Sequence, residues 1–386
     1  MAIGTFWRRL FGRSSRGFRA SIQLTKMDER ITPTLNVSPI FAVGSGPGMD
    51  ATVKVYTSSG TLLDTFKPYP LPGGTFFQGG VDVAIGDIDG DGVPDVITGA
   101  GPGGGPHVKV FKGTDIAAGN PNPTVLRSFF AYQSDFMGGV HVAAGDVNGD
   151  GLIDVITGAG PGGGPHAKVF SNGNQGDLLM SFYAYESTFR GGVNVAAGDI
   201  GGDGVTDEVI TGAGNSGGPK VGVYKFISDP NPEATQWKIA EYFAYDSNLR
   251  GGVSVASGFT TNNRDSSNFL YSDIITGAGP NGGPHVKVFR LLDALYDSQG
   301  RPANWQFFDA GNLFPYPSTF TGGVRVGVVR NGTYDDILTG PGPGTVGPDQ
   351  RIYNQTSIGD LTTYVPTQRF QQFPFDSTYQ GGISVS

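Results

Sequence analysis

The feature that most constrains the fold of this chain is a unit that recurs six times after residue 40. One marker of the unit is a Gly-Gly pair followed by an alternating apolar segment. It begins at Gly79, Gly138, Gly191, Gly251, Gly322 and Gly381, at spacings of 59, 53, 60, 71 and 59 residues. Three further markers also occur six times, exemplified by DVITGAGPG from Asp95, VKVF from Val108 and FFAY from Phe129. Repetition at this period is typical of solenoids, propellers and other repeat arrays.

Each unit contains four short segments rich in β-branched and aromatic residues, which favour strands over helices. The 64 glycines and 26 prolines of the chain lie between these segments, where they mark turns. Four short strands repeated radially are the pattern of propeller blades. The sequence therefore predicts an all-β fold, a six-bladed β-propeller with four-stranded antiparallel blades.

The order of the segments predicts how the ring closes. The repeats start at a second segment, at Ile40, and end after a first segment, in residues 381–386. We therefore expect the C-terminal strand to join the N-terminal blade, so that residues 40–386 form the propeller without an open sheet edge. A solenoid is the structural alternative, and it would need capping repeats at its ends.

Residues 1–39 form a segment of different composition. Residues 1–30 carry a charge of +5, whereas the rest of the chain sums to −13. An ordinary secretory signal has an unbroken apolar core, and this segment has none. It is either a disordered or processed leader, or an export address or basic amphipathic anchor that contacts a membrane surface. The acidic body argues against nucleic acid as a partner, and no stretch is long enough for a transmembrane helix. The chain has no cysteine, which excludes disulfides and thiol chemistry.

Two acidic loops between the first and second segments have the oxygen spacing of calcium sites. The first would use the side chains of Asp87, Asp89, Asp91 and Asp95 and the carbonyl of Val93; the second would use those of Asp146, Asn148, Asp150 and Asp154 and the carbonyl of Leu152. Calcium takes about six to eight hard oxygens, and a tight glycine-containing loop supplies several of them from neighbouring residues. Both loops lack the glutamate at position 12 of an EF-hand. A plain Asp-Gly hairpin turn is the alternative.

A third loop repeats this pattern incompletely, with Asp199, Asp203, Asp207 and the carbonyl of Val205. Gly201 stands where the other two loops have a third side-chain ligand. The later repeats keep only Asp273 and Asp336. The sequence thus predicts two strong Ca²⁺ sites and one weaker site, with a structural role and dissociation constants of about 10⁻⁴–10⁻³ M.

Other recurring motifs have structural interpretations. The GPGGGPH run at Gly101 and Gly160 lacks a following helix and a GK[ST] sequence, so it predicts a turn rather than a phosphate loop. Repeated histidines and basic residues lie in different blades, so we expect structural roles and pairing with carboxylates or carbonyls; they are His107, His166, His285, Lys54, Lys109, Lys168, Lys287 and Arg351. Repeated tyrosines either pack between blades or stack on sugar rings; they are Tyr185, Tyr245 and Tyr316.

These units resemble the FG-GAP (VCBS-like) repeat family, the calcium-loop propeller repeat also found in the heads of integrin α-chains. The FG position is Gly-Gly here, as in GGVHVAAGD from Gly138, and the GAP position is Gly-Ala-Gly, as in residues 99–101. The resemblance covers about residues 40–386. The GPGGGPHVKVF form looks like the repeats of large planctomycete surface proteins, and LTKMDERITPT (residues 24–34) looks like the leader that often precedes them. The resemblance implies extracellular, calcium-stabilised adhesion or scaffolding and no common catalytic reaction.

Two functional hypotheses follow. The first is a non-enzymatic, exported, calcium-binding module of the cell surface or envelope that contacts surface proteins or further copies of itself. The alternative is a carbohydrate-binding lectin or adhesin that uses clefts between blades. No non-repeated acid–base constellation stands out, so we expect no enzyme and no cofactor besides Ca²⁺. The longest departures from the repeat, residues 259–271 and 290–304, are where we expect a unique site, because loops on a rigid scaffold carry specificity.

Overall fold

The computed structural model describes residues 39–229, 231–233, 236–261, 270–293, 305–344, 347–355 and 366–386. All of them belong to one compact unit, Asn36–Ser386. Residues 1–38, which contain nearly all of the predicted leader, lie outside the described residues. So do residues 262–269 and 294–304, which make up most of the two predicted unique loops.

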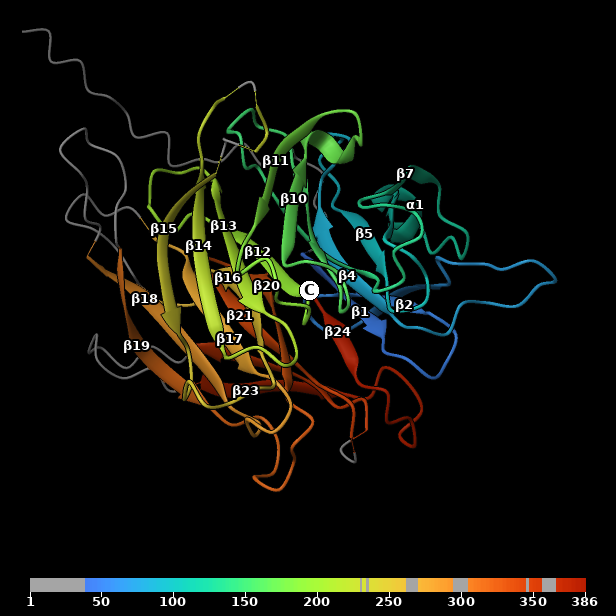
Figure 1. Ribbon diagram of the computed structural model, residues 1–386. Helices are drawn as coiled ribbons and strands as arrows, with labels where there is room; N and C mark the ends of the chain where they lie inside the picture. Colours follow the sequence, from blue (N-terminus) through green and yellow to red (C-terminus); the bar gives the residue numbers. More distant parts are fainter. Residues whose placement is uncertain are drawn as a thin grey trace, which may run out of the picture. The chain divides into compact units, whose positions relative to one another are not determined.

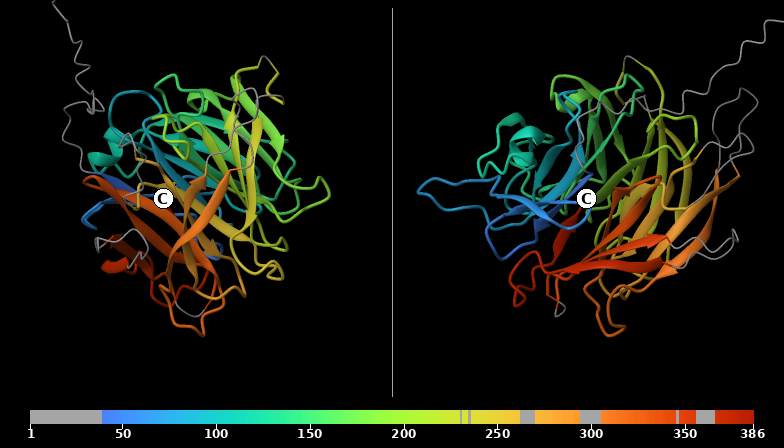
Figure 2. Two further views of the ribbon diagram at one scale, coloured as in Figure 1. Left: turned by 90° about the vertical axis from the view of Figure 1, so that its left-hand side faces the viewer. Right: turned by 180° about the vertical axis from the view of Figure 1, so that it is seen from behind.

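The described residues form six sheets of four antiparallel strands each, the blades of a β-propeller (Figures 1 and 2). The first blade consists of β24 (Ile383–Val385), β1 (Ile40–Ser45), β2 (Val53–Thr57) and β3 (Leu62–Phe66). The second consists of β4 (Val81–Gly86), β5 (Asp95–Ala100), β6 (His107–Phe111) and β7 (Val125–Phe130), with the short helix α1 (Gly113–Ala117) between its last two strands. The third consists of β8 (Val140–Gly145), β9 (Asp154–Ala159), β10 (His166–Phe170) and β11 (Leu178–Tyr183), with the 3-10 turn η1 (Ser171–Gly173) in the corresponding place.

The remaining three blades repeat this order. The fourth consists of β12 (Val193–Gly198), β13 (Glu208–Ala213), β14 (Lys220–Phe226) and β15 (Gln236–Phe243). The fifth consists of β16 (Val253–Gly258), β17 (Asp273–Ala278), β18 (Val286–Asp293) and β19 (Gln306–Leu313). The sixth consists of β20 (Val324–Asn331), β21 (Tyr334–Pro341), β22 (Gln350–Gln355) and β23 (Pro366–Gln372).

The ring closes through the C-terminal strand, as predicted. In Figure 1 the red strand β24 lies beside the blue strand β1, and the two pair antiparallel with Val43 opposite Val385 and Ser45 opposite Ile383. The first blade thus takes its inner strand from one end of the chain and its other three strands from the opposite end. This pairing covers the edge of β1 that would otherwise be open.

The hydrophobic core lies between neighbouring blades. All six residues of β5 are buried, because this strand has a paired strand on each side and another blade against its faces. One cluster joins Ile97, Val108 and Val110 of the second blade to Val142 and Phe170 of the third. Interior strands buried on both faces read as continuous apolar runs, which explains why DVITGA lacks the polar alternation of an exposed strand.

A glycine in this run permits the blades to approach closely. A Cβ atom built on Gly99 of β5 would lie 2.3 Å from the carbonyl oxygen of Val140, on the inner strand of the next blade. No side chain fits at that distance, so the Gly-Ala-Gly motif is a packing requirement at this position.

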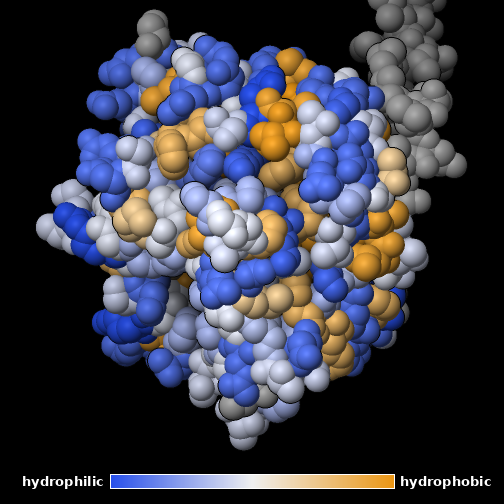
Figure 3. Space-filling view, turned by 90° about the vertical axis from the view of Figure 1, so that its right-hand side faces the viewer, coloured by the Kyte–Doolittle hydropathy of each residue, from blue (hydrophilic) through white to orange (hydrophobic). Residues whose placement is uncertain are grey.

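The surface drawn in Figure 3 is mixed. Hydrophobic residues on that face lie in small groups separated by hydrophilic ones. Among the described residues, no helix has the length and hydropathy that crossing a membrane requires.

Candidate functional site

The loop from Asp87 to Asp95 brings carboxylates together, and its own backbone orients them. Asp87 accepts hydrogen bonds from the N–H groups of Gly90 (2.9 Å) and Gly92 (2.8 Å), and Asp95 accepts one from Ile88 (2.9 Å). One carboxylate oxygen from each of Asp87, Asp89 and Asp95 lies within 4.8 Å of the others. Burial raises the pKa of Asp95 to about 6, opposed by its backbone hydrogen bonds. Such a buried carboxylate is stabilised by a nearby positive charge.

A lysine provides positive charge at this loop. The ammonium of Lys112, which directly follows β6, donates to Asp89 at 2.5 Å and to Asp91 at 2.9 Å. These hydrogen bonds raise the pKa of Lys112. Its ammonium therefore competes with a metal ion for two of the predicted ligands.

The loop from Asp146 to Asp154 has a similar set of backbone hydrogen bonds without that lysine, but among the described residues only the first loop brings three carboxylate oxygens within 4.8 Å of one another. Asp146 accepts from the N–H groups of Asp150 (3.0 Å) and Gly151 (2.9 Å), and Asp154 accepts from Val147 (2.9 Å). Burial raises the pKa of Asp154 to about 6. The position equivalent to Lys112, directly after the third strand of the blade, is Ser171. The predicted carbonyl ligands of the two loops, Val93 and Leu152, follow the glycines at 92 and 151.

The third loop is organised around a residue that the sequence prediction did not include. Gly198 pairs with Glu208 in the register in which Gly86 pairs with Asp95, so Glu208 holds the place of Asp95. The Glu208 carboxylate accepts from the N–H of Ile200 at 3.0 Å. The third loop has one extra residue before the strand, Asp207. Lys225 holds the position of Lys112, because it directly follows Tyr224 in the motif VGVYK as Lys112 directly follows Phe111.

Lys225 neutralises this third loop internally. Its ammonium lies 3.2 Å from Asp203, 2.6 Å from Asp207 and 2.9 Å from Glu208. Asp199 keeps its backbone bonds from Asp203 and Gly204, while the Val205 N–H donates to Asp203. Burial raises the pKa of Asp199 to about 6. Three carboxylates of the third loop, those of Asp203, Asp207 and Glu208, thus already share the Lys225 ammonium.

In the later blades, hydroxyl, amide and guanidinium groups bind the remaining aspartates. Asp273 accepts from the hydroxyl groups of Thr260 (2.9 Å) and Thr261 (2.7 Å). Asp336 pairs with Arg369 at 2.7 Å and accepts from Asn331. Neither presents the cluster of free carboxylates that a calcium ion needs.

The donor sets of the first two loops fit calcium. They offer hard carboxylate oxygens with a Gly-rich backbone that fixes their spacing, as calcium loops require. The third loop fits poorly, because Lys225 supplies the positive charge there. Occupancy of any of the three loops stays a prediction.

The repeated tyrosines lie between blades. Tyr185 donates to the carbonyl oxygen of Lys220 (3.0 Å), Tyr245 to that of His285 (3.0 Å) and Tyr316 to that of Asp349 (2.8 Å), each in the next blade along the chain. This geometry agrees with the packing interpretation rather than with stacking on sugars.

The repeated histidines and basic residues are also held by the fold. His107 and His166 share hydrogen bonds of 2.9 Å with Ser128 and Ser181, and His285 lies 2.6 Å from the Asn312 side-chain oxygen. Most of the repeated basic residues have the carbonyl or carboxylate partner that we expected: Lys109 with Pro68, Lys168 with Ala131, Lys287 with Asp309 and Arg351 with Asp349. The remaining cation, Lys54, lies 5.6 Å from the ring centroid of Phe375.

Exposed aromatic residues occupy a different repeat position, two residues before the last aromatic residue in five of the six motifs. Their exposed fractions run from 40% at Phe130 to 63% at Phe314, and the set is Phe130, Tyr183, Phe243, Phe314 and Phe373. The Phe130, Tyr183 and Phe314 rings each contact a histidine, with centroid distances of 4.8, 4.9 and 4.4 Å. Tyr183 lines a cleft of about 660 Å³ between the third and fourth blades, with polar groups from both: His166, Ser181, Lys220, Lys238 and Glu241.

A second feature absent from the sequence prediction is a central cavity of about 710 Å³ lined by the inner strands. The second residue of each inner strand lines it, and these residues differ in every blade but two: Asp82, His141, Asn194, Ser254, Arg325 and Ser384. The signal in the sequence was the residue after each Gly-Gly-Val or Gly-Gly-Ile. It varies in chemistry while its neighbours repeat.

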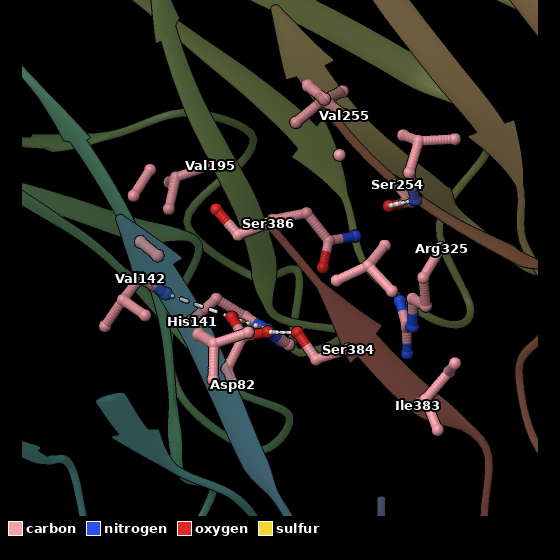
Figure 4. A pocket seen from close by; sticks show the side chains of 18 of the residues that line it. Asp82, His141, Val142, Val195, Ser254, Val255, Arg325, Ile383, Ser384 and Ser386 are labelled. Carbon is pink, nitrogen blue, oxygen red and sulfur yellow. Dashed lines mark hydrogen bonds and ion pairs between the residues drawn. The ribbon is translucent and has the colours of Figure 1, made fainter. Parts of the chain in front are cut away.

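Asp82 is the centre of a polar cluster in this cavity (Figure 4). It accepts hydrogen bonds from the Ser384 hydroxyl, from the N–H of Val142 (3.0 Å) and from His141 Nδ1 (3.3 Å). Burial raises its pKa, but the bonds to His141, Ser384 and Val142 outweigh burial and leave the pKa lowered. This is a non-repeated acid–base set of the kind that the sequence analysis did not find. Because Ser384 donates to Asp82 and not to His141, it is not the relay of a serine nucleophile.

No protein-family model matches the chain, and no curated protein matches it. Solved structures similar to it include an N-acetylglucosamine-specific lectin of Agrocybe aegerita, at 14% identity and a TM-score of 0.43 over 85% of this chain and 76% of that one. A rhamnogalacturonan lyase of Bacillus licheniformis matches at 12% and 0.33 over 86% and 78%. A polycomb repressive complex 2 structure from Chaetomium thermophilum matches at 10% and 0.47 over 83% and 64%. None of these values carries an argument about what this chain does. The fold itself defines the class: a six-bladed β-propeller.

Proposed function

We propose that this chain is a non-enzymatic, exported, calcium-binding β-propeller that serves as a structural or protein-interaction module of the cell surface. The observation that carries the proposal is the gathering of the Asp87, Asp89 and Asp95 carboxylates within 4.8 Å of one another. Asp87, Asp89, Asp95 and the Val93 carbonyl would hold Ca²⁺ in the first loop, and the corresponding atoms of residues 146–154 would hold it in the second. The bound charge would remove the mutual repulsion of these carboxylates and stiffen each hairpin.

Counting bound calcium tests the metal part of this proposal. Native mass spectrometry and calorimetry on the full chain should find two ions, with a weaker third at high concentration. Asp89→Asn and Asp150→Asn keep the side-chain shape but remove a charged ligand from each loop, so each should remove one ion from the count. Asp135→Asn, an exposed aspartate outside the loops, is the matched control. A count of zero for the unaltered chain contradicts the proposal.

Light scattering tests the assembly part. The full chain and a version that starts at Pro39 should be compared with calcium and with chelator. Defined oligomers that form with the full chain but not with the shortened one support a structural role in which residues 1–38 promote assembly. Monomers under all four conditions contradict self-association and leave interaction with other surface proteins as the role to test.

Glycan binding is a second candidate, and the exposed aromatic residues favour it. Sugar rings stack on exposed aromatic faces while nearby polar groups bind hydroxyls. The five exposed rings, and the cleft of about 660 Å³ beside Tyr183 with its ammonium and carboxylate groups, match this need. The chain would then bind several glycans with similar, modest affinities.

A glycan array followed by saturation-transfer NMR tests this candidate. Tyr183→Ala should abolish transfer at the cleft, and Phe314→Ala should reduce the number of sites by one. Leu71→Ala removes an exposed apolar side chain outside the aromatic set and should change nothing. Glycan binding that survives both aromatic variants at full strength would contradict the aromatic platform.

A further inference from the structure

Four of the six residues that ring the central cavity join one inner strand to the next. Ser384 of β24 donates to Asp82 of β4, and Asp82 accepts from the backbone of β8 at Val142 (3.0 Å). Asn194 of β12 donates to the carbonyl oxygen of Val253 on β16 at 2.7 Å. Ser254 of β16 accepts from the N–H of Val326 on β20 at 3.3 Å. The fifth residue, His141, contacts Asp82. These five therefore have roles within the fold.

Arg325 differs from them. It lies on β20, lines the same cavity and is half-buried, yet within the described part of the chain its guanidinium makes no hydrogen bond or ion pair. Among the labelled residues of Figure 4, dashed lines reach Asp82, His141, Val142, Ser254 and Ser384 but not Arg325. Burial lowers the pKa of Arg325, and the charge of Asp82 opposes this effect. A guanidinium carries five N–H donors, and at Arg325 the described chain binds none of them. These donors are therefore available to a molecule that enters the cavity.

The surroundings of Arg325 narrow the chemistry of that anion. The planar fork of a guanidinium matches a carboxylate in a bidentate geometry. Asp82 contributes a negative charge to the same cavity, which disfavours a dianion such as a phosphate ester. The Asp82 oxygen that accepts only from Ser384, and the second amide hydrogen of Asn194, remain able to bind hydroxyl groups. A volume of about 710 Å³ is ample for a small molecule.

We propose that the central cavity binds a small hydroxylated monocarboxylate, such as a sugar acid, with Arg325 holding its carboxylate group. Asp82 and Asn194 bind its hydroxyl groups. This site is separate from the acidic loops and from the exposed aromatic residues. Its test is therefore independent of the function proposed above.

Calorimetry on the full chain with three matched probes tests the ligand class. d-Glucuronate has both the carboxylate and the hydroxyl groups, d-glucose lacks the carboxylate, and acetate lacks the hydroxyls. We expect d-glucuronate to bind with one-to-one stoichiometry and the other two at least tenfold more weakly. Equal binding of d-glucose and d-glucuronate, tighter binding of inorganic phosphate, or no binding of d-glucuronate would each overturn the proposal.

Variants of Arg325 test the residue. Arg325→Gln should weaken d-glucuronate binding by at least tenfold, and Arg325→Lys, which keeps the charge but not the fork, should bind with intermediate affinity. Arg190→Gln removes an exposed guanidinium outside the cavity and should bind like the unaltered chain. Because Arg325 has no partner within the described chain, its replacement should leave the thermal midpoint unchanged or higher. Unaltered binding by Arg325→Gln, or a large fall in its midpoint, would contradict the assignment.

Discussion

The interfaces between blades and the wall of the central cavity follow opposite rules. At the interfaces one solution recurs: Tyr132 and Tyr245, for example, each donate to a carbonyl oxygen of the next blade. Around the cavity, the second positions of the six inner strands carry an acid, an imidazole, an amide, hydroxyls and a guanidinium. A repeated residue is one that every blade needs to pack, whereas a position free to differ can be specialised. The comparison therefore assigns the packing of the blades to the repeated interface positions. The cavity positions make bonds particular to one pair of inner strands or, at Arg325, leave donors open to a ligand.

The largest effect should come from disturbing a repeated interface position. Gly99→Ala places a methyl group where the Cβ lies 2.3 Å from the Val140 carbonyl oxygen. The blades must separate to admit it, at a cost of about 3 kcal/mol or more in unfolding free energy. Thermal or urea unfolding measures this loss. Gly176→Ala, where the nearest atom to the new Cβ is 3.7 Å away, is the control and should change stability by less than about 0.5 kcal/mol. Equal stability of the two variants would contradict the packing requirement.

A smaller loss should come from the polar cluster of the cavity. Asp82→Asn keeps an acceptor for the Val142 N–H, and the Ser384 hydroxyl can turn to accept from the new amide, but the carboxylate charge is lost. Replacing these charge-assisted hydrogen bonds by neutral ones should cost about 1–3 kcal/mol. Ser384→Ala removes only one bond and should cost less than Asp82→Asn in the same unfolding experiment. If Asp82→Asn is as stable as the unaltered chain, the cluster does not hold the closing strand β24 against β4.

The two acidic loops that best fit calcium offer a finer comparison, because only the first has a lysine. Lys112→Ser gives the first loop the residue that the second has at Ser171 and removes an ammonium from Asp89 and Asp91. Calcium affinity at the first loop should rise by about fivefold, as expected for displacing two exposed ion pairs. Calorimetry on a background of Asp150→Asn, which disables the second loop, measures it. An unchanged affinity would mean that Lys112 does not compete for the site.

The sequence was enough to predict the blades because their positions repeat. Six copies of the strand markers give the number of blades and their strand order, and the offset between first and last copies gives the closure that Val43 and Val385 confirm. The sequence did not predict that Glu208 holds in the third loop the position that Asp95 holds in the first. The third loop has one extra residue before β13, and only the pairing of Glu208 with Gly198 reveals the shift. The sequence also did not predict the cavity. Residues 82 and 325 are 243 positions apart in the chain, and only closure of the ring brings them to one space.

The smallest expected effect is a pH dependence built into the repeated interface positions. Burial lowers the pKa of both His107 and His166 to about 4, with Lys109 and Lys168 adding to the effect, against 6.5 for an unperturbed histidine. Between these values the unfolded chain binds more protons than the folded one, so these residues make stability rise with pH. Their contribution is fully present above about pH 6.5 and is lost as the pH falls toward 4.

The double variant His107→Gln/His166→Gln isolates that contribution. Other groups titrate in the same window with the opposite sign, since burial raises the pKa of Asp95 and Asp154 to about 6. The measurement is therefore the difference in thermal midpoint between the two proteins at pH 4.5, 5.5 and 7. Because glutamine keeps a hydrogen-bonding group near Ser128 and Ser181 but takes up no proton, the variant should lose less stability than the unaltered chain on acidification. A difference in thermal midpoint that is constant over the three pH values would mean that the pKa of the two histidines is the same in the folded chain as in the unfolded one.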